Sequence, residues 1–209
     1  EILWIGAESI EEHDPNKYLD GVSAIVVPGG FGYRGVEGMI EAARYAREEN
    51  VPYLGLCLGL QVMVIEIARH LLGREDANST EFSDETSSPV IDLMPDQVGV
   101  DQKGGTMRLG AYPCSITTGT LTHRAYDTDM VMERHRHRFE INNAYREDLL
   151  SVGLKASGVS PNGKLVEIVE LDGHPFMVGT QFHPEFLSRP TTPHPLFREF
   201  LNVAKGISR

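Results

Sequence analysis

Two short segments carry residue types that could together perform nucleophilic catalysis. The first is Gly55-Leu56-Cys57-Leu58-Gly59, where an apolar run ends and a helical pattern begins. A nucleophile elbow has this spacing, because its glycines permit a sharp turn that presents the middle side chain outside the sheet. The free N–H groups and dipole of a helix N-terminus favour a thiolate over a thiol. We therefore predict that Cys57 is a nucleophile, and the alternative is a buried packing cysteine.

The second segment is Gln181-Phe182-His183-Pro184-Glu185. Side chains two residues apart in an extended chain point to the same side, so Glu185 can lie beside His183. A carboxylate that accepts one ring N–H sets the tautomer and leaves the other nitrogen free for proton transfer. A histidine–glutamate pair on its own is more often a surface contact. Beside an elbow cysteine, His183 is predicted as the base and Glu185 as its orienting partner.

A third segment, Pro28-Gly29-Gly30-Phe31-Gly32, follows an apolar run. Glycines after a strand leave backbone N–H groups free to approach a ligand. No Lys-Ser or Lys-Thr follows to complete a phosphate-binding loop, so a phosphate site is disfavoured. The N–H groups of Gly30 and of Leu58 could instead bind a tetrahedral oxyanion. The alternative is a bare turn without a function.

Alternating strands and helices must position these three segments. The apolar runs at 23–27 and 51–56 predict buried strands, and 36–50 and 58–72 predict helices. Short links between them are typical of a parallel sheet with helices on both faces. We therefore predict an α/β fold with a mainly parallel central sheet flanked by helices.

The rest of the chain predicts a smaller antiparallel strand region. Short strands are expected from 106 to 141, and a hairpin is expected over 164–182 around an Asp-Gly turn. The apolar run at 2–7 predicts a further buried strand. Residues 95–105 predict a surface loop, and 193–204 predict a C-terminal helix.

The glycine pair, the cysteine elbow and the Phe-His-Pro-Glu sequence, in this order, resemble the class I glutamine amidotransferases. Longer stretches at 28–35, 78–82, 104–110 and 133–143 are similar to the glutaminase domains of CTP synthases. The likeness extends from residue 2 to about residue 201. It implies the flavodoxin-like fold of class I glutamine amidotransferases and a single domain of this kind over residues 1–209.

The resemblance implies a chemistry. Cys57, His183 and Glu185 would hydrolyse the side-chain amide of L-glutamine to glutamate and ammonia through a cysteine thioester. Gly30 and Leu58 would hold the oxyanion.

The resemblance also implies the residues that bind the substrate. From the residues alone, Glu81 is one more charge in a solvated loop, and 134–138 is a charged strand or a modest phosphate patch. The likeness instead places charged groups opposite the ammonium and carboxylate of glutamine. The implied set is Gly30, Phe31, Leu58, Gln61, Glu81 and Arg138.

For the full enzyme, the resemblance implies an amidoligase domain as the partner of the glutaminase domain. That domain would use the ammonia, with ATP and Mg, to aminate UTP to CTP, with GTP as an activator and a homotetramer as the assembly. No cofactor and no metal are implied for the glutaminase domain itself. Relatives carry the amidoligase domain first, followed by a strand and helix before the segment at Ile2. The chain is therefore expected to be N-terminally incomplete.

Composition limits the remaining functions. The formal net charge of −11 disfavours nucleic acid or an anionic membrane as the main partner. Two cysteines, Cys57 and Cys114, make neither a disulfide framework nor a paired-cysteine metal site. The N-terminus lacks a signal-peptide pattern and no stretch is apolar enough to span a bilayer, so a cytoplasmic setting is expected. The alternatives are a stand-alone glutamyl hydrolase and a catalytically silent regulatory domain. The intact set of Cys57, His183 and Glu185 disfavours the silent domain.

Overall fold

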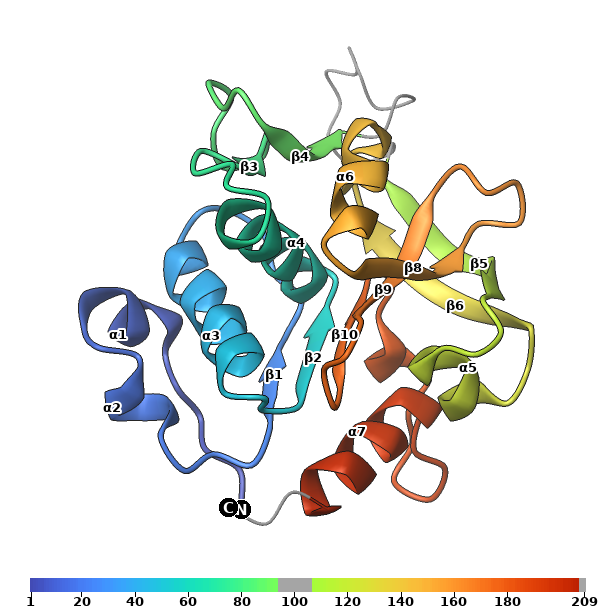
Figure 1. Ribbon diagram of the computed structural model, residues 1–209. Coiled ribbons are helices and arrows are strands. Elements are labelled where there is room, and N and C mark those ends of the chain that lie inside the picture. Colours follow the sequence, from blue (N-terminus) through green and yellow to red (C-terminus); the bar gives the residue numbers. More distant parts are fainter. Residues whose placement is uncertain (94–106, 207–209) are drawn as a thin grey trace.

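The computed structural model describes residues 1–93 and 107–206 (Figure 1). The predicted loop at 95–105 lies outside the described residues. The helices are α1 (Ala7–Glu12), α2 (Asn16–Leu19), α3 (Val36–Glu48), α4 (Leu58–His70), α5 (Leu121–Tyr126), α6 (Arg146–Ser151) and α7 (Pro195–Gly206), with the 3-10 turns η2 (Asn143–Tyr145) and η3 (Pro184–Phe186). The strands are β1 (Ile25–Val27), β2 (Tyr53–Leu56), β3 (Asn78–Ser79), β4 (Pro89–Leu93), β5 (Arg108–Ile116), β6 (Met130–His137), β7 (Phe139–Ile141), β8 (Leu154–Val159), β9 (Val166–Leu171) and β10 (Met177–Thr180).

Within the described residues the main sheet has seven strands in the order β1-β2-β10-β9-β8-β5-β6. The predicted α/β class is confirmed, but the sheet is mixed rather than mainly parallel. β1, β2 and β10 pair in parallel, whereas every pairing from β10 to β6 is antiparallel. Parallel neighbours need a long crossover, which α3 provides between β1 and β2, while short turns suffice farther along the chain. A small second sheet has the order β3-β4-β7.

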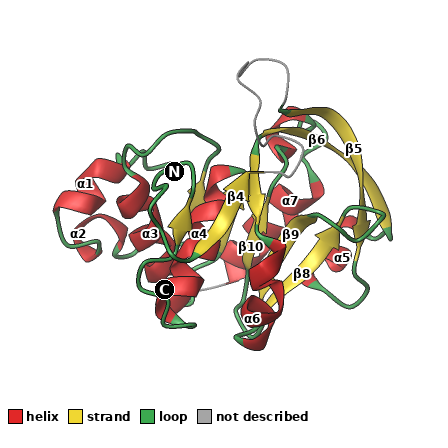
Figure 2. Ribbon diagram, turned by 90° about the horizontal axis from the view of Figure 1, so that it is seen from above, coloured by secondary structure: helices red, strands yellow, loops and turns green. Residues whose placement is uncertain are grey.

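Each face of the main sheet covers its own hydrophobic core. Tyr53 and Met177 belong to the cluster that includes residues of α3 and α4. Their chain neighbours Leu54 and Val178 belong to the cluster that includes residues of α5 and α7. Alternate strand residues point to opposite faces, so one short apolar strand can contribute to both cores. The helices that belong to the two cores are drawn in Figures 1 and 2.

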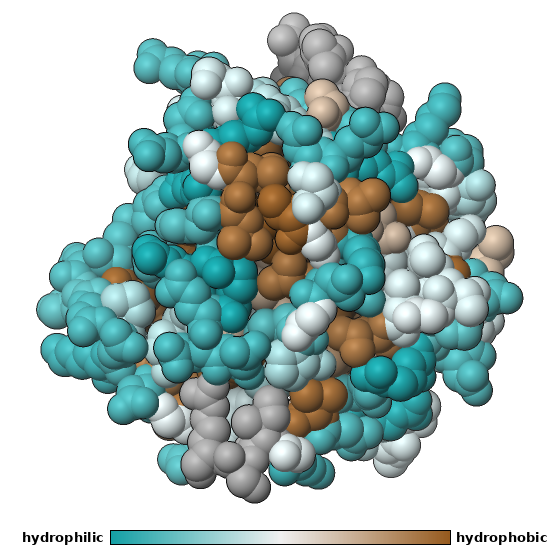
Figure 3. Space-filling view, viewed as in Figure 1, coloured by the Kyte–Doolittle hydropathy of each residue, from teal (hydrophilic) through white to brown (hydrophobic). Residues whose placement is uncertain are grey.

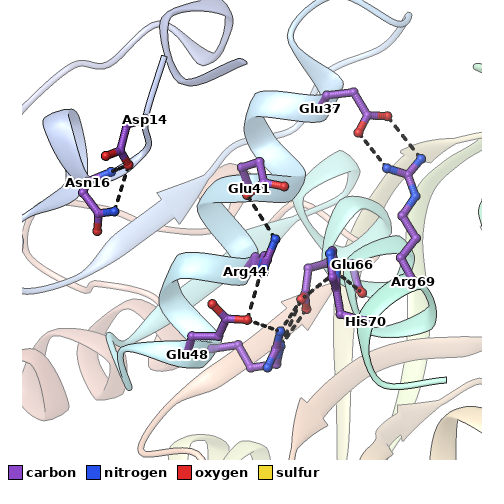
Figure 4. A network of polar contacts seen from close by, with 10 residues as sticks. Asp14, Asn16, Glu37, Glu41, Arg44, Glu48, Glu66, Arg69 and His70 are labelled. Atoms are coloured by element: carbon purple, nitrogen blue, oxygen red, sulfur yellow. Dashed lines mark hydrogen bonds and ion pairs between the residues drawn. The ribbon is translucent and has the colours of Figure 1, made fainter. Parts of the chain in front are cut away.

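A buried ion pair fixes α4, the helix that follows the elbow cysteine, against α3. Glu66 on α4 has no exposed surface, and Arg47 of α3 reaches its carboxylate at 2.8 Å (Figure 4). His70, one turn later on α4, lies 3.2 Å from the same carboxylate. Nearer the start of α3, Glu37 pairs with Arg69 at 2.6 Å. Residues near both ends of α3 are therefore tied to the C-terminal half of α4.

The structure corrects two expectations about strands. Residues 2–7 do not form a strand: the chain up to Gly6 is irregular, and α1 begins at Ala7. Trp4 is 91% exposed, because this apolar run has no strand beside it among the described residues. Conversely, β8 is a strand that the sequence does not predict, since its Lys155, Ser157 and Gly158 interrupt the apolar pattern.

The face shown in Figure 3 is mostly hydrophilic, with apolar residues gathered near its middle. No helix in residues 1–93 or 107–206 is both long enough and apolar enough to cross a membrane.

Candidate active site

The elbow places Cys57 between the end of β2 and the start of α4. Its backbone has φ 51° and ψ −98°, a region that side-chain-bearing residues seldom adopt. The flanking glycines are required by close packing. A Cβ on Gly55 would lie 2.4 Å from the carbonyl oxygen of Gly59, and one on Gly59 would lie 2.2 Å from that of Val27. Strand β1, strand β2 and helix α4 can therefore approach closely only with glycine at both positions.

His183 and Glu185 form a direct contact at the start of η3. The Nδ1 atom of His183 lies 2.6 Å from Oε1 of Glu185. A carboxylate accepts, so Nδ1 carries the proton and Nε2 is the nitrogen left for chemistry. Nε2 is buried and has no hydrogen-bond partner among the described residues. Phe186 stacks on the ring, with centroids 4.8 Å apart and planes 15° apart, which restricts the ring's rotation.

The electrostatics of the site favour a charged imidazole. Burial alone would lower the pKa of His183, but interactions with the Cys57 side chain and with Glu185 outweigh it and raise the pKa to about 10. At neutral pH His183 is therefore an imidazolium beside Cys57. This is the form that can give a proton to a departing amine.

Gly29 lies against the side chains of both His183 and Cys57. A Cβ at this position would stand 2.7 Å from Cε1 of His183 and 3.6 Å from Cβ of Cys57. Only glycine leaves room for the ring at its observed place.

Gly29→Ala is therefore expected to displace His183 and to lower kcat about 10- to 100-fold, because small misplacements of catalytic groups are costly. Steady-state kinetics with glutamine would measure the change. Gly163→Ala is the control for a glycine substitution as such, since nothing lies within 4 Å of a Cβ there. An alanine at the φ of 72° found there carries backbone strain but no steric clash. Unchanged kcat in Gly29→Ala would contradict the role of this close approach.

The structure brings Gly30 and Leu58, the predicted oxyanion donors, next to each other. A Cβ on Gly30 would meet Cδ2 of Leu58 at 2.9 Å. Leu58 is the first residue of α4, where backbone N–H groups have no partner within the helix. An oxyanion held there would also meet the positive end of the helix dipole.

Glu81 contacts the glycine loop rather than lying free in solvent. Its Oε1 accepts the backbone N–H of Gly32 at 2.9 Å. The contact ties the segment after β3 to the loop that carries Gly30. Phe31, between the two glycines, is 91% exposed, so its ring borders the site without packing into it.

Gln61 comes from a distant part of the chain but contacts Phe139, the residue after Arg138. Gln61, in the first turn of α4, donates from Nε2 to the carbonyl oxygen of Phe139 at 3.2 Å. Arg138 precedes Phe139 in the break between β6 and β7 and is partly buried. It makes no hydrogen bond or ion pair with residues in the described part of the chain. Its guanidinium is available to a carboxylate ligand.

A buried polar cluster lies beneath the site. His135 and His137 on β6 share a hydrogen bond of 2.9 Å between Nδ1 and Nε2. Arg108 on β5 reaches Glu167 on β9 at 2.7 Å, and His135 lies 3.7 Å from the same carboxylate. Burial and the charge of Arg108 lower the pKa of His135 to about 2 and that of His137 to about 3. Both rings are therefore neutral in the folded protein.

The family is decided by comparison with known proteins. A family model described as glutamine amidotransferase class-I matches residues 1–203. The chain belongs to this family. This is the family that the glycine pair, the cysteine elbow and the Phe-His-Pro-Glu sequence resemble.

Among class I glutamine amidotransferases, the similarity is to CTP synthases. The CTP synthase of Dehalococcoides mccartyi strain CBDB1 is 62% identical over 209 residues, which is all of this chain and 38% of that protein. The CTP synthase of Roseiflexus sp. strain RS-1 is 61% identical over 205 residues, covering 98% and 37%. The chain thus spans less than two fifths of the length of these relatives.

Solved structures place the match within those longer proteins. The glutaminase domain of Trypanosoma brucei CTPS with bound acivicin aligns with a TM-score of 0.90 and 40% identity, covering 100% of this chain and 82% of that one. The chain is homologous to the CTP synthase glutaminase domain, so the predicted resemblance is confirmed. A glutamine amidotransferase of Thermotoga maritima, at 14% identity and a TM-score of 0.54, covers 95% of this chain and 69% of that one and shares the fold.

Sequence reasoning missed two residues of the site. The motifs mark Gly29 only as half of a glycine pair, and Gln181 only as the start of a segment. Gln181 is wholly buried and donates from Nε2 to Sγ of Cys57 at 3.7 Å. Its position two residues before His183 was the available signal, because residues i and i+2 of an extended segment face the same side.

Proposed function

We propose that this chain is one glutamine amidotransferase domain that hydrolyses L-glutamine to glutamate and ammonia. The observation that carries the proposal is the placement of Cys57 on a strained elbow beside an imidazole that Glu185 holds at 2.6 Å. Glutamine as substrate is supported by the bound acivicin named for the trypanosomal domain. No cofactor takes part in the proposed reaction.

The reaction follows from the roles of the groups. Sγ of Cys57 bonds to the amide carbon, and the oxygen takes the charge between the N–H groups of Gly30 and Leu58. His183 gives its Nε2 proton to the nitrogen, the C–N bond breaks and ammonia leaves. Water then gives a proton to Nε2 and attacks the thioester. The C–S bond breaks, which restores the Cys57 thiolate, and glutamate is released after the proton of its new carboxyl group passes to solvent.

The ammonia is proposed to serve a second domain. The relatives are CTP synthases more than twice as long as this chain. We therefore propose an amidoligase domain as its partner, with ATP-dependent amination of UTP to CTP there. Mg and a GTP activator, a homotetramer and a cytoplasmic location belong to the same proposal.

The test is to measure glutamate and ammonia together in the presence of glutamine. Equal amounts of both products from free glutamine are expected. A stand-alone glutamyl hydrolase would instead prefer γ-glutamyl peptides, and a silent domain would release neither product. Either outcome would overturn the proposal.

Glu81 is proposed to pair with the α-ammonium of glutamine, so Glu81→Ala is expected to raise KM about 10- to 100-fold, the value of one charge-assisted hydrogen bond. Glu81→Gln is the matched variant, because its amide oxygen can still accept the N–H of Gly32 while the charge is gone. A similar rise in both variants would assign the effect to charge. Reaction of Cys57 with a small neutral alkylator should survive in both. An unchanged KM would place Glu81 outside the site.

A further inference from the structure

Gln181 is held in a fixed position beside the nucleophile. Its backbone N–H donates to the carbonyl oxygen of Glu167 on β9 at 2.8 Å. The carbonyl of the preceding residue, Thr180, accepts the backbone N–H of Cys57 at 2.7 Å. The elbow and the segment that carries Gln181 are therefore joined by their backbones. The side chain has no exposed surface and reaches Sγ of Cys57 with its Nε2 donor.

A packing role alone does not account for an amide at this place. A buried amide costs free energy unless it is hydrogen-bonded. Within the described residues, Oε1 of Gln181 has no partner, and the side-chain hydrogen bond of Nε2 is the one to Sγ of Cys57. An apolar side chain of similar volume would fill the same space without that cost.

The amide distinguishes between the two forms of the nucleophile. A thiolate is a much stronger acceptor than a thiol, since hydrogen bonds to ionised groups are about twice as strong as those between neutral groups. A donor that points at the sulfur therefore stabilises the anion relative to the neutral form. The amide carries no charge and keeps its N–H throughout the catalytic cycle.

We propose that Gln181 is a further catalytic residue, whose side-chain N–H stabilises the Cys57 thiolate before attack. The inference rests on the proposed glutaminase function only for its part in turnover; the thiolate contact stands without it. As Sγ bonds to the substrate, charge moves from sulfur to the oxyanion, and the amide hydrogen bond weakens. Gln181 thus raises the fraction of Cys57 that is present as thiolate. The backbone N–H groups of Gly30 and Leu58 stabilise the oxyanion that forms afterwards.

The experiment compares the pH dependence of Cys57 alkylation by iodoacetamide in the wild-type protein and in Gln181→Met, which has similar volume and no donor. In the variant, the pH of half-maximal rate is expected to move upward, with a rate about tenfold lower at neutral pH. At high pH the two rates should meet or cross, because a less stabilised thiolate is the better nucleophile. Turnover of glutamine should fall with KM unchanged. Thr122→Val is the control, since it also removes a fully buried hydrogen-bonding group, but on α5 and away from Cys57. It should leave the alkylation profile unchanged.

Coinciding alkylation profiles for wild type and Gln181→Met would overturn the inference. A second measurement needs no substitution at 181. The NMR signal of the Gln181 side-chain amide should titrate with the midpoint found by alkylation, and the titration should vanish in Cys57→Ser. An amide signal that does not change across that range would also overturn it. Because neither readout needs glutamine, failure here is distinct from failure of the proposed function.

Discussion

Cys57→Ala is expected to abolish ammonia release and covalent labelling by a glutamine-mimicking electrophile together. Removing the nucleophile of such a triad costs at least about 10⁴-fold in kcat, because attack, thioester formation and hydrolysis all pass through it. Cys114 cannot replace it. Cys114 is wholly buried on β5, and burial, followed by the charges of Glu167 and Glu133, raises the pKa of its thiol.

Mass spectrometry of the labelled protein decides between the two cysteines. The modified peptide should contain Cys57 in the wild type, and no peptide should be modified in Cys57→Ala. Cys114→Ala is the control and should keep both labelling and turnover. A label found mainly on Cys114 would refute the assignment of the nucleophile.

The second large effect concerns stability in mild acid. His135 and His137 are buried as neutral rings, with folded pKa values of about 2 and 3. In the unfolded chain a histidine titrates near 6.5, so below that pH the unfolded state binds more protons. The contribution of the two rings to the free energy of unfolding is fully present above pH 6.5. It is lost progressively as the pH falls toward 3. Between pH 6 and pH 5 the pair should cost about 2 kcal/mol of unfolding free energy.

The surroundings of the two rings explain why protonation is resisted. Burial comes first, and the guanidinium of Arg108 and the charge of His183 add to it, while the carboxylate of Glu167 lies 3.7 Å from His135. Urea unfolding at pH 7.5, 6 and 5 measures the effect. The double variant His135→Gln, His137→Gln should be less stable at pH 7.5 but nearly flat between pH 6 and 5. His13→Gln, at an exposed histidine, should keep the wild-type slope. A wild-type protein with no slope would contradict the buried neutral state.

Local patterns allowed the elbow and its scaffold to be predicted from sequence. Each prediction depended on only a few neighbouring residues. These were the two glycines around Cys57 for the elbow, the apolar stripe for α3, and Asp172-Gly173 for the hairpin of β9 and β10. Strand β6 shows the limit of such patterns. It buries Glu133, His135 and His137 and exposes Met130 and Met132, the reverse of the usual polarity.

The buried polar face of β6 depends on partners far along the chain. Arg108 on β5 pairs with Glu167 on β9 at 2.7 Å beside His135, and Glu133 pairs with His194 at 2.9 Å, because buried charges need partners. The contact between Gln181 and Cys57 is likewise made by the sheet, across 124 positions of sequence. The i, i+2 spacing places Gln181 on the side of His183, but no residue near either side chain in the sequence indicates that Gln181 contacts Cys57. Contacts between residues this far apart in the sequence can be predicted only once the fold is known.

The backbone conformation at Cys57 lowers the stability of the fold at the position of the proposed nucleophile. Asn50 and Asp127 also have positive φ, but their types tolerate it, whereas a cysteine at φ 51° and ψ −98° carries strain of order 1 kcal/mol or more. A glycine there would relax the turn and remove the proposed nucleophile in the same step. A lineage selected for stability alone would drift toward glycine at this site, so a cysteine at position 57 in a descendant sequence would be a record of continued selection for turnover.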